Sequence, residues 1–241
     1  TRDEIDGVKR NIVTILGHEL RTPLTLVVGY AELLKDINLE AMSHTELLTF
    51  LRGINDGADR LRRLIENFIL LVEIDAGDVE KTYEWRAGDV ADLSTIVLAA
   101  RDYVFSKGEN HKCRADIPAN LPPVYGDREY LMIVFRELLD NAAKFSPEGS
   151  EVSITVSPDG KSIRTEIRDQ GDGIPPEELK RIWDIFHQVD RDKHEHQGGG
   201  AGLPIVQGLV KLHGGVVEVE STEGEGSMFA VSLPVKQAGS A

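Results

Sequence analysis

The chain is poor in cysteine, in positive charge and in long hydrophobic runs. Cys113 is the only cysteine among 241 residues, so no disulfide can form within the chain, which suits a reducing compartment. No apolar run approaches the roughly 18 residues that a membrane span needs, and no signal peptide is visible. Because the sequence begins inside an apparent helix, we expect a cytoplasmic fragment whose membrane attachment, if any, lies upstream.

Negative charge exceeds positive charge by a wide margin. The 41 Asp and Glu residues against 27 Lys and Arg residues give a formal net charge of −14, which argues against binding nucleic acid or an acidic membrane surface. A small anionic ligand is still compatible with a local cluster of hydrogen-bond donors. Hydrophobic residues make up 41% of the chain, enough for one large domain or two modest ones.

Residues 1–76 have the hydrophobic spacing of two long helices. The repeat in the second half is the stricter one and is typical of a helical-bundle seam. Ser43 and Glu46 form a capping box that predicts where the second helix begins. Two helices alone bury too little apolar surface, so we expect two copies to pair through residues 1–76 into a four-helix bundle. The stricter repeat runs through Leu47, Leu51, Ile54, Ala58, Leu61, Ile65, Phe68 and Val72.

A mixed pattern of helices and strands begins near residue 77 and predicts an α+β domain. The expected domains are a helical one over residues 1–78, a polar linker over 79–89, a second domain over 90–236 and a disordered tail over 237–241. Asp127 is the expected N-cap of one helix. Helices are predicted near 91–107, 128–145 and 203–213, and strands near 111–117, 151–157, 162–169, 215–221 and 227–234.

The most informative stretch is His18-Glu19-Leu20-Arg21-Thr22-Pro23, which lies within the first helix. Since each helical residue advances about 100°, His18 points roughly 200° away from the seam at Leu16 and Leu20, onto an exposed polar stripe. Imidazole, with an unperturbed pKa of ~6.5, is available as a neutral nucleophile near neutral pH. An exposed helical histidine with no role is an equally good interpretation of this stretch taken alone.

Three residues near His18 favour a catalytic role for this histidine over an exposed histidine with no role. Thr22 lies one turn further on the same face, where its hydroxyl is placed to orient a water or a group on His18. Glu19 lies about 100° from His18 and needs a sideways rotamer to reach the imidazole, where it would orient the ring and accept a proton. Pro23 cannot donate a hydrogen bond to the carbonyl of Glu19, so we expect the helix to bend or loosen there.

A second group of residues lies on a predicted helix of the second domain. Glu137, Asn141 and Lys144 share one face of that helix because they are four and three residues apart. The oxygen of an Asn side chain is a suitable ligand for Mg²⁺, and a nearby lysine suits phosphate. Taken alone, this helix is better explained by a solvated polar face.

Two glycine-containing segments complete the pattern. Asp169 ends a strand and precedes Gly171 and Gly173, and a buried aspartate there accepts a hydrogen bond from the amine of adenine but not from guanine. The run Gly198-Gly199-Gly200-Ala201-Gly202-Leu203-Pro204 opens a helix whose free N–H groups suit phosphate, although a flexible linker would look similar. The polar segment between Phe186 and Gly198 has the composition of a lid, and loop polarity explains its His194-Glu195-His196 better than a metal site does.

Together these segments resemble, in order and in residue type, the ATP-binding domain of the gyrase, Hsp90, histidine kinase and MutL superfamily. Trp183 and Phe186 match its aromatic lid anchor. With His18 upstream, nearly the whole chain resembles the catalytic core of a sensor histidine kinase. The resemblance implies a multidomain α and α+β fold, in which an antiparallel helical hairpin forms a dimeric four-helix bundle and is followed by an α/β-sandwich ATP-binding domain of the Bergerat type.

The resemblance implies an ATP-dependent protein-histidine autokinase of a two-component system. The γ-phosphoryl group of Mg-ATP would pass to His18 and then to an aspartate of a response regulator. Glu19 would assist as base, and Thr22 would place water for a reverse phosphatase reaction. Glu137 corresponds to the glutamate that activates water in ATP-hydrolysing relatives, and a structural role is as compatible. The implied Mg²⁺ ligand is Asn141, and the implied cofactor-binding residues are Asn141, Lys144, Phe145, Asp169, Gly171, Gly173, Arg191, Gly198, Gly200, Gly202 and Leu203.

The sequence departs from the family pattern at three places. Gln188 stands where many relatives have a phosphate-binding arginine, and Gly199 and Ala201 replace the commoner threonine and leucine of the second glycine motif. Glu137 is Asn in many kinases. Two other classes of function therefore stay open: a nucleotide-binding or ATP-hydrolysing switch without histidine phosphorylation, and a dimeric scaffold that binds a receiver domain without catalysis.

Overall fold

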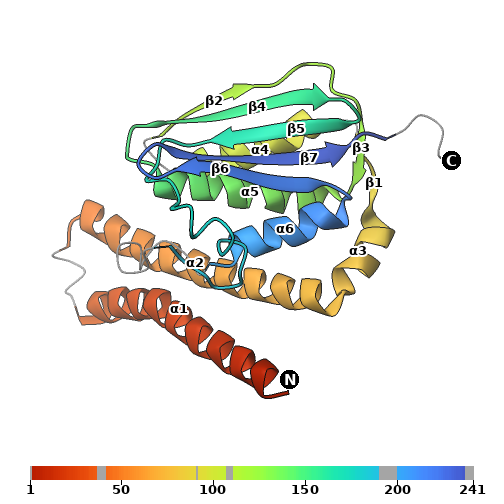
Figure 1. The fold of residues 1–241 in the computed structure, drawn as a ribbon. Coiled ribbons are helices and arrows are strands. Elements are labelled where there is room, and N and C mark those ends of the chain that lie inside the picture. The colour runs from red at the N-terminus through yellow and green to blue at the C-terminus, as the bar shows by residue number, and fades with distance from the viewer. Residues whose placement is uncertain (1, 37–41, 91, 107–110, 190–199, 237–241) are drawn as a thin grey trace. The chain divides into compact units, whose positions relative to one another are not determined.

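A computed structural model describes residues 2–36, 42–90, 92–106, 111–189 and 200–236 (Figure 1). The chain divides into two compact units, residues 1–70 and 71–241. The predicted tail over 237–241 lies outside the described residues. Among the helices that are described, none is both long and apolar enough to cross a membrane.

The first unit is a helical hairpin made of α1 (Arg2–Asp36) and most of α2 (His44–Ala76). The predicted capping box is confirmed at the start of α2: the Glu46 N–H donates to Ser43 Oγ at 3.2 Å, and the Ser43 N–H donates to the Glu46 carboxylate at 2.9 Å. The helix α1 continues through Pro23, which is buried. The proline therefore lies within the hairpin and does not end the helix.

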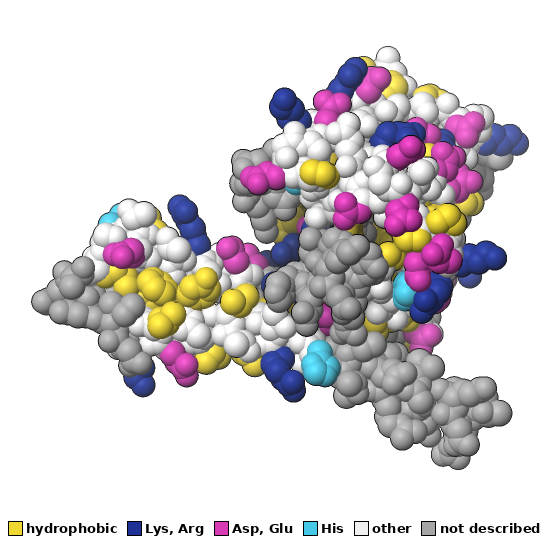
Figure 2. Space-filling view, turned by 60° about the vertical axis from the view of Figure 1, so that its left-hand side comes forward, with side chains coloured by type: hydrophobic (Ala, Val, Ile, Leu, Met, Phe, Trp, Pro, Cys, Tyr) yellow, Lys and Arg dark blue, Asp and Glu magenta, His cyan; other side chains and the backbone are white. Residues whose placement is uncertain are grey.

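The hairpin leaves many apolar side chains exposed. Three of the predicted seam residues, Leu51, Ile65 and Val72, are 48%, 47% and 51% exposed. Figure 2 shows hydrophobic side chains gathered in a run along the hairpin. Among the hairpin residues whose exposure the structure describes, the other large exposed apolar ones are Leu24, Leu26, Val28, Leu33, Leu48 and Ile69. This is the kind of surface that the expected second copy would cover.

The second unit contains a five-stranded sheet with helices α4, α5 and α6 packed against one face (Figure 1). The strand order is β2-β4-β5-β7-β6, in which β2 and β4 are parallel and the other neighbours are antiparallel. The α+β pattern predicted for this region is confirmed. Its elements are α3 (Asp78–Arg86), β1 (Gly88–Val90), α4 (Leu93–Phe105), β2 (Lys112–Asp116), β3 (Val124–Gly126), α5 (Arg128–Phe145), β4 (Glu151–Asp159), β5 (Ser162–Arg168), α6 (Gly202–Leu212), β6 (Val216–Thr222) and β7 (Gly226–Pro234).

Strand alternation places the core on the helix-covered face of the sheet. The register puts Ile154 opposite Ile167, and Ile167 opposite Phe229, and all three are buried. The next residues along each strand point to the other face, where Arg164 of β5 forms ion pairs with Glu166 and with Glu218 of β6. Cys113 lies half-buried on β2, and burial raises the pKa of its thiol to about 11, which disfavours the reactive thiolate.

The predicted polar linker contains regular structure that its sequence pattern does not reveal. Its residues form helix α3 and strand β1, and β1 pairs antiparallel with the equally unpredicted β3. Arg86 at the end of α3 donates a 2.6 Å hydrogen bond to the Asp127 carboxylate and lies 4.7 Å over the ring of Tyr130. Asp127 is the N-cap of α5, as predicted, and accepts hydrogen bonds from the Glu129 and Tyr130 N–H groups. The linker is therefore tied to the start of α5.

Candidate functional site

The imidazole of His18 lies on the exposed side of α1, as the helical phase predicts. Thr22, one turn further, is half-buried. The hydroxyl of Thr25 donates to the Arg21 carbonyl oxygen at 2.8 Å, so it is occupied by the helix backbone. An exposed histidine with a threonine one turn away is accessible to another protein or domain.

Glu19 is buried, unlike the adjacent His18, which is exposed. Its side chain is buried, with 5% of the residue exposed, inside the hairpin. The Glu19 carboxylate interacts electrostatically with Arg60 of α2: burial lowers the pKa of the Arg60 guanidinium, and Glu19 opposes that shift. The sequence predicted that Glu19 needs a sideways rotamer to reach His18. In this structure the carboxylate is buried and lies near the charge of Arg60.

The polar face of α5 brings three predicted residues together. Asn141 is half-buried, and Lys144 forms an ion pair with Asp140 of the preceding turn. Glu137 is 8% exposed, and Arg136 donates to its carboxylate at 3.2 Å. Glu137 lies against the start of α6, because a Cβ atom on Gly202 would lie 2.6 Å from Glu137 Oε2. The helix that carries the predicted Mg²⁺ ligand therefore contacts the predicted phosphate-binding loop.

Asp169 follows β5, and its carboxylate accepts hydrogen bonds from the backbone. It is 7% exposed, and its Oδ1 accepts hydrogen bonds from the N–H groups of Gly171, at 2.8 Å, and Ser227, at 3.0 Å. Burial raises the pKa of the Asp169 carboxyl above its ordinary value of 3.8, and the two N–H donors oppose that shift. No described residue donates to its Oδ2. That oxygen suits an amine donor such as the one on adenine.

The glycines after Asp169 are required by the backbone. Gly173 has φ of 71°, and a Cβ atom there would lie 2.0 Å from the Thr222 carbonyl oxygen. Gly171 lies against the carbonyl of Phe145, whose side chain is 40% exposed at the end of α5. The turn after β5 can therefore pass close to α5 and to the end of β6 only because these positions have no side chain.

The described part of the second glycine motif opens α6. Gly200 and Ala201 precede the helix, and Gly202 and Leu203 begin it, with no side chain capping the first N–H groups. The Phe186 N–H donates to the Gly200 carbonyl oxygen at 3.0 Å, and Phe186 itself has φ of 63°, which is uncommon for a residue other than glycine. Trp183 contacts Phe229 edge-on at 6.3 Å, which anchors the preceding segment to the core. Arg191, Gly198, Gly199 and His194-Glu195-His196 lie outside the described residues.

Sequence reasoning missed two charged contacts near the predicted sites. Arg60 of α2 lies near enough to Glu19 for the carboxylate to oppose the lowering of the Arg60 pKa by burial. His187 forms a close contact with Glu178 at the base of the segment that begins after Phe186. The sequence pattern does not predict the contact between His187 and Glu178, because it depends on the turns between these two residues.

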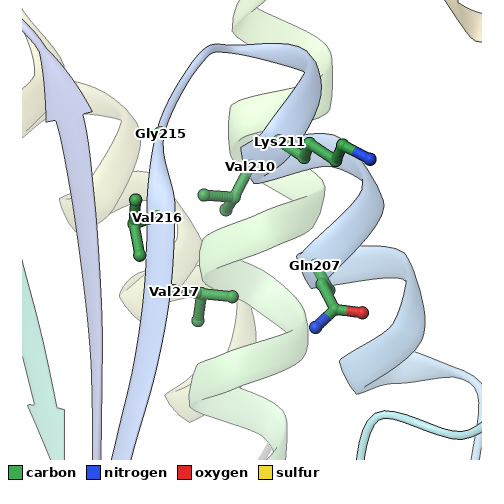
Figure 3. Close-up of a pocket in the computed structure, with 6 residues that line it drawn as sticks. All are labelled: Gln207, Val210, Lys211, Gly215, Val216 and Val217. Atoms are coloured by element: carbon green, nitrogen blue, oxygen red, sulfur yellow. The ribbon is translucent and has the colours of Figure 1, made fainter.

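The predicted nucleotide site, formed by α5, the turn after β5 and the start of α6, does not coincide with the hollow between α6 and β6. That hollow, of about 180 Å³, is lined by Gln207, Val210, Lys211, Gly215, Val216 and Val217 (Figure 3). It lies at the second half of α6, away from the helix start that carries the free N–H groups. In the part of the chain that the structure describes, no group of three His, Cys, Asp or Glu side chains is arranged to bind a metal. A Mg²⁺ ion at Asn141 would thus depend on phosphate and water for its other ligands, as is common for Mg²⁺.

Comparison with known proteins places each unit in a family. Residues 8–77 match the family model of the His Kinase A (phospho-acceptor) domain. Residues 126–237 match the model of the histidine kinase-, DNA gyrase B- and HSP90-like ATPase. The first match contains His18, and the second contains Asn141, Asp169 and the glycine loop.

Similar proteins align over nearly the full chain. The sensor histidine kinase WalK of Bacillus subtilis is 28% identical over 98% of this chain and 38% of its own length. The phosphate regulon sensor protein PhoR of Pseudomonas aeruginosa is 31% identical over 94% of this chain and 50% of its own length. The crystal structure of full-length ShkA in complex with AMPPNP has a TM-score of 0.59 and 26% identity, and the match covers 96% of this chain and 47% of that one. The chain thus spans half or less of these relatives.

Proposed function

Because this chain belongs to the sensor histidine kinases and is their catalytic core, we propose that it transfers the γ-phosphoryl group of ATP to His18 and then to an aspartate of a response regulator. The observation that carries the proposal is the exposed His18 on a phospho-acceptor hairpin, in a chain that also has the residues proposed to contact adenine, Mg²⁺ and phosphate, Asp169, Asn141 and Lys144. In the transfer, a bond forms between a His18 ring nitrogen and the γ-phosphorus, the bond from that phosphorus to the bridging oxygen breaks, and ADP leaves with the electron pair.

The nucleotide would be held by the residues that α5, the turn after β5 and α6 bring together. Asp169 Oδ2 would accept the amine of adenine, and Asn141 would be the protein ligand of Mg²⁺. A bound Mg²⁺ ion supplies neutralisation of phosphate charge. Lys144 would exchange its Asp140 partner for phosphate, and the N–H groups at Gly202 and Leu203 would receive a phosphate at the start of α6.

Proton transfer would fall to the residues around His18. Glu19 would accept the imidazole proton as the bond to phosphorus forms. Thr22, half-buried one turn away, would place water for hydrolysis of a phosphorylated regulator. The apolar face of the hairpin supports pairing of two copies into a four-helix bundle, and the exposed His18 stripe supports docking of a receiver domain.

Labelling with ATP that carries a labelled γ-phosphate tests the proposal. We expect label that is acid-labile and alkali-stable and that disappears in His18→Gln, because the acceptor nitrogen is then absent. The control is His44→Gln, which removes an exposed histidine at the start of α2 and should keep the label.

The other outcomes separate the alternative functions. Label that survives His18→Gln would contradict the assignment of His18. ATP hydrolysis without label would favour a switch in which Glu137 activates water, whereas failure to bind ATP would favour a scaffold. The ion pair of Glu137 with Arg136 and its contact with Gly202 support a positioning role for that residue over the water-activating one.

A further inference from the structure

The hydroxyl of Ser221 lies where three segments of the second unit meet. Ser221 is on β6, directly opposite Ser227 near the start of β7. Its Oγ accepts a hydrogen bond from the Ile174 N–H at 2.8 Å and donates one to the Gly226 carbonyl oxygen at 2.9 Å. The same oxygen lies 2.8 Å from Ser227 Oγ. One half-buried side chain on β6 thus joins the segment at Ile174 to the start of β7.

Both of the joined segments flank Asp169. The Ser227 N–H donates to Asp169 Oδ1 at 3.0 Å, and the Asp169 N–H donates to the Ser227 carbonyl oxygen at 2.9 Å. Gly226, with φ of 97°, lies against Asp169, since a Cβ atom there would lie 2.4 Å from the Asp169 carbonyl oxygen. Ile174 follows the glycine-containing turn that begins at Asp169. The position of the Asp169 carboxylate therefore depends on two segments, and Ser221 is hydrogen-bonded to both.

The hydrogen-bonding capacity of Ser221 also decides which way the Ser227 hydroxyl is turned. A serine hydroxyl has one hydrogen and two lone pairs. The Ser221 hydrogen goes to the Gly226 carbonyl oxygen, and the Ile174 N–H occupies one lone pair. Ser227 must then be the donor in the bond between the two hydroxyls. Its Oγ is left with lone pairs alone, so it can accept from an amine but cannot donate to a carbonyl oxygen.

We propose that Ser221 is a positioning residue for recognition of the adenine base, which acts by fixing the Asp169 carboxylate and the acceptor role of the Ser227 hydroxyl. This inference rests on the proposed binding of ATP at Asp169. Adenine has an amine where hypoxanthine and guanine have a carbonyl oxygen. A site edge that offers only acceptors favours the amine and rejects the carbonyl oxygen. Ser221 acts through its neighbours and is not assigned a nucleotide contact.

Removal of the Ser221 hydroxyl should weaken discrimination between the bases. In Ser221→Ala the Ile174 N–H and the Gly226 carbonyl oxygen lose their partner, and Ser227 becomes free to donate. We expect the affinity for ATP to fall by about tenfold. The affinity for inosine triphosphate, which differs from ATP at the edge that carries the amine, should stay the same. A merely structural role would weaken the binding of both nucleotides alike.

Isothermal titration of ATP and of inosine triphosphate into the full chain, with Mg²⁺ present, measures both affinities. Ser221→Thr keeps the hydroxyl on a residue that suits a strand, and it should keep the wild-type ratio of the two affinities. The matched control is Ser232→Ala, which removes a half-buried serine at the other end of β7, opposite Val216, and should also keep that ratio. If Ser221→Ala does not fold, Ser221→Cys is the test, because a thiol of similar size is a weak donor and acceptor and the ratio should again fall.

Failure of this inference is distinguishable from failure of the proposed function. A wild-type preference for ATP that persists without the Ser221 hydroxyl would overturn the role of Ser221 alone. An equal loss of affinity for both nucleotides would overturn it too, because Ser221 would then serve only the fold. Absence of ATP binding in wild type would overturn the proposed function and this inference together.

Discussion

At the scale of single residues, the adenine contact depends on how the two oxygens of Asp169 are divided. Oδ1 is occupied by the N–H groups of Gly171 and Ser227, which fix the plane of the carboxyl group. Oδ2 has no donor among the described residues and is left for the ligand. A side chain of the same shape could therefore keep the internal bonds and lose only the ligand contact.

Asp169→Asn tests this division. The amide oxygen can still accept both N–H bonds, whereas the amide nitrogen presents a donor to the donor amine of adenine. We expect ATP affinity to fall by about 10- to 100-fold, equivalent to roughly 1.5–3 kcal/mol, with little change in unfolding temperature. Isothermal titration of ATP measures the affinity.

The control for Asp169→Asn is Asp159→Asn, which makes the same change at an exposed position at the end of β4. It should bind ATP like wild type. A normal affinity in Asp169→Asn would show that the carboxylate does not read the base. A large fall in unfolding temperature would instead mean that Oδ1 and Oδ2 both serve the fold.

At the scale of elements, His213 joins the end of α6 to the start of α5. Its Nδ1–H donates to the Leu209 carbonyl oxygen at 2.7 Å, and its Nε2 accepts the Asp127 N–H at 3.0 Å. These two bonds require the neutral ring with its proton on Nδ1. Burial lowers the pKa of His213, and the ring is 4% exposed. The neutral ring therefore fits the junction of the two helices better than the charged ring does.

This lowered pKa predicts a loss of stability in mild acid. The unfolded chain protonates His213 near the ordinary value of 6.5, whereas the folded chain resists protonation until a lower pH, so the unfolded state binds more protons in that window. We expect the free energy of unfolding to fall by on the order of 1 kcal/mol between pH 7 and pH 5 because of this residue. Urea unfolding at several pH values measures it.

A variant comparison isolates the contribution of His213. His213→Gln should have a lower free energy of unfolding at pH 7 and a weaker pH dependence below pH 6.5. His44→Gln removes an exposed histidine and should preserve the wild-type dependence. Equal pH dependence in wild type and His213→Gln would contradict the prediction.

Helix starts that depend on local capping residues could be predicted from the sequence, whereas short elements that depend on distant contacts could not. Ser43 and Glu46 cap α2, and Asp127 caps α5, because capping depends on residues three positions apart and needs no distant partner. Helix α3 and strands β1 and β3 were not predicted. α3 is a short helix with few buried residues, and β1 and β3 have three residues each, so long-range contacts such as the one between Arg86 and Asp127 determine them.

At the scale of the whole molecule, the two units have different surfaces. The second unit buries its apolar residues between one sheet and three helices, whereas the first unit exposes Leu51, Ile65 and Ile69. A net charge of −14 keeps such a chain soluble and opposes non-specific association. Pairing of two hairpins thus needs apolar burial that outweighs the repulsion between like-charged copies.

Charges placed on the apolar face test the pairing. We expect Leu51→Glu combined with Ile65→Glu to raise the dimer dissociation constant by about 100-fold or more, because each copy would bury two unpaired carboxylates. Sedimentation of the full chain over a range of concentrations measures this. Thr49→Glu, an exposed position on the opposite side of α2, should leave the dimer intact. A dimer that tolerates the double substitution would mean that another surface forms the contact.

The sequence by itself determined the two long helices, the larger helices and strands of the second unit, the exposure of His18 and the residue types of the proposed nucleotide site, because helical phase and short motifs are local properties. Tertiary structure alone decided that Glu19 is buried near Arg60, that Glu137 lies against Gly202, and that Asp169 Oδ1 is shared between Gly171 and Ser227. The physical reason is that these contacts join residues 41 or more positions apart or choose between rotamers of one side chain. Burial and packing make that choice, and no spacing along the chain encodes it.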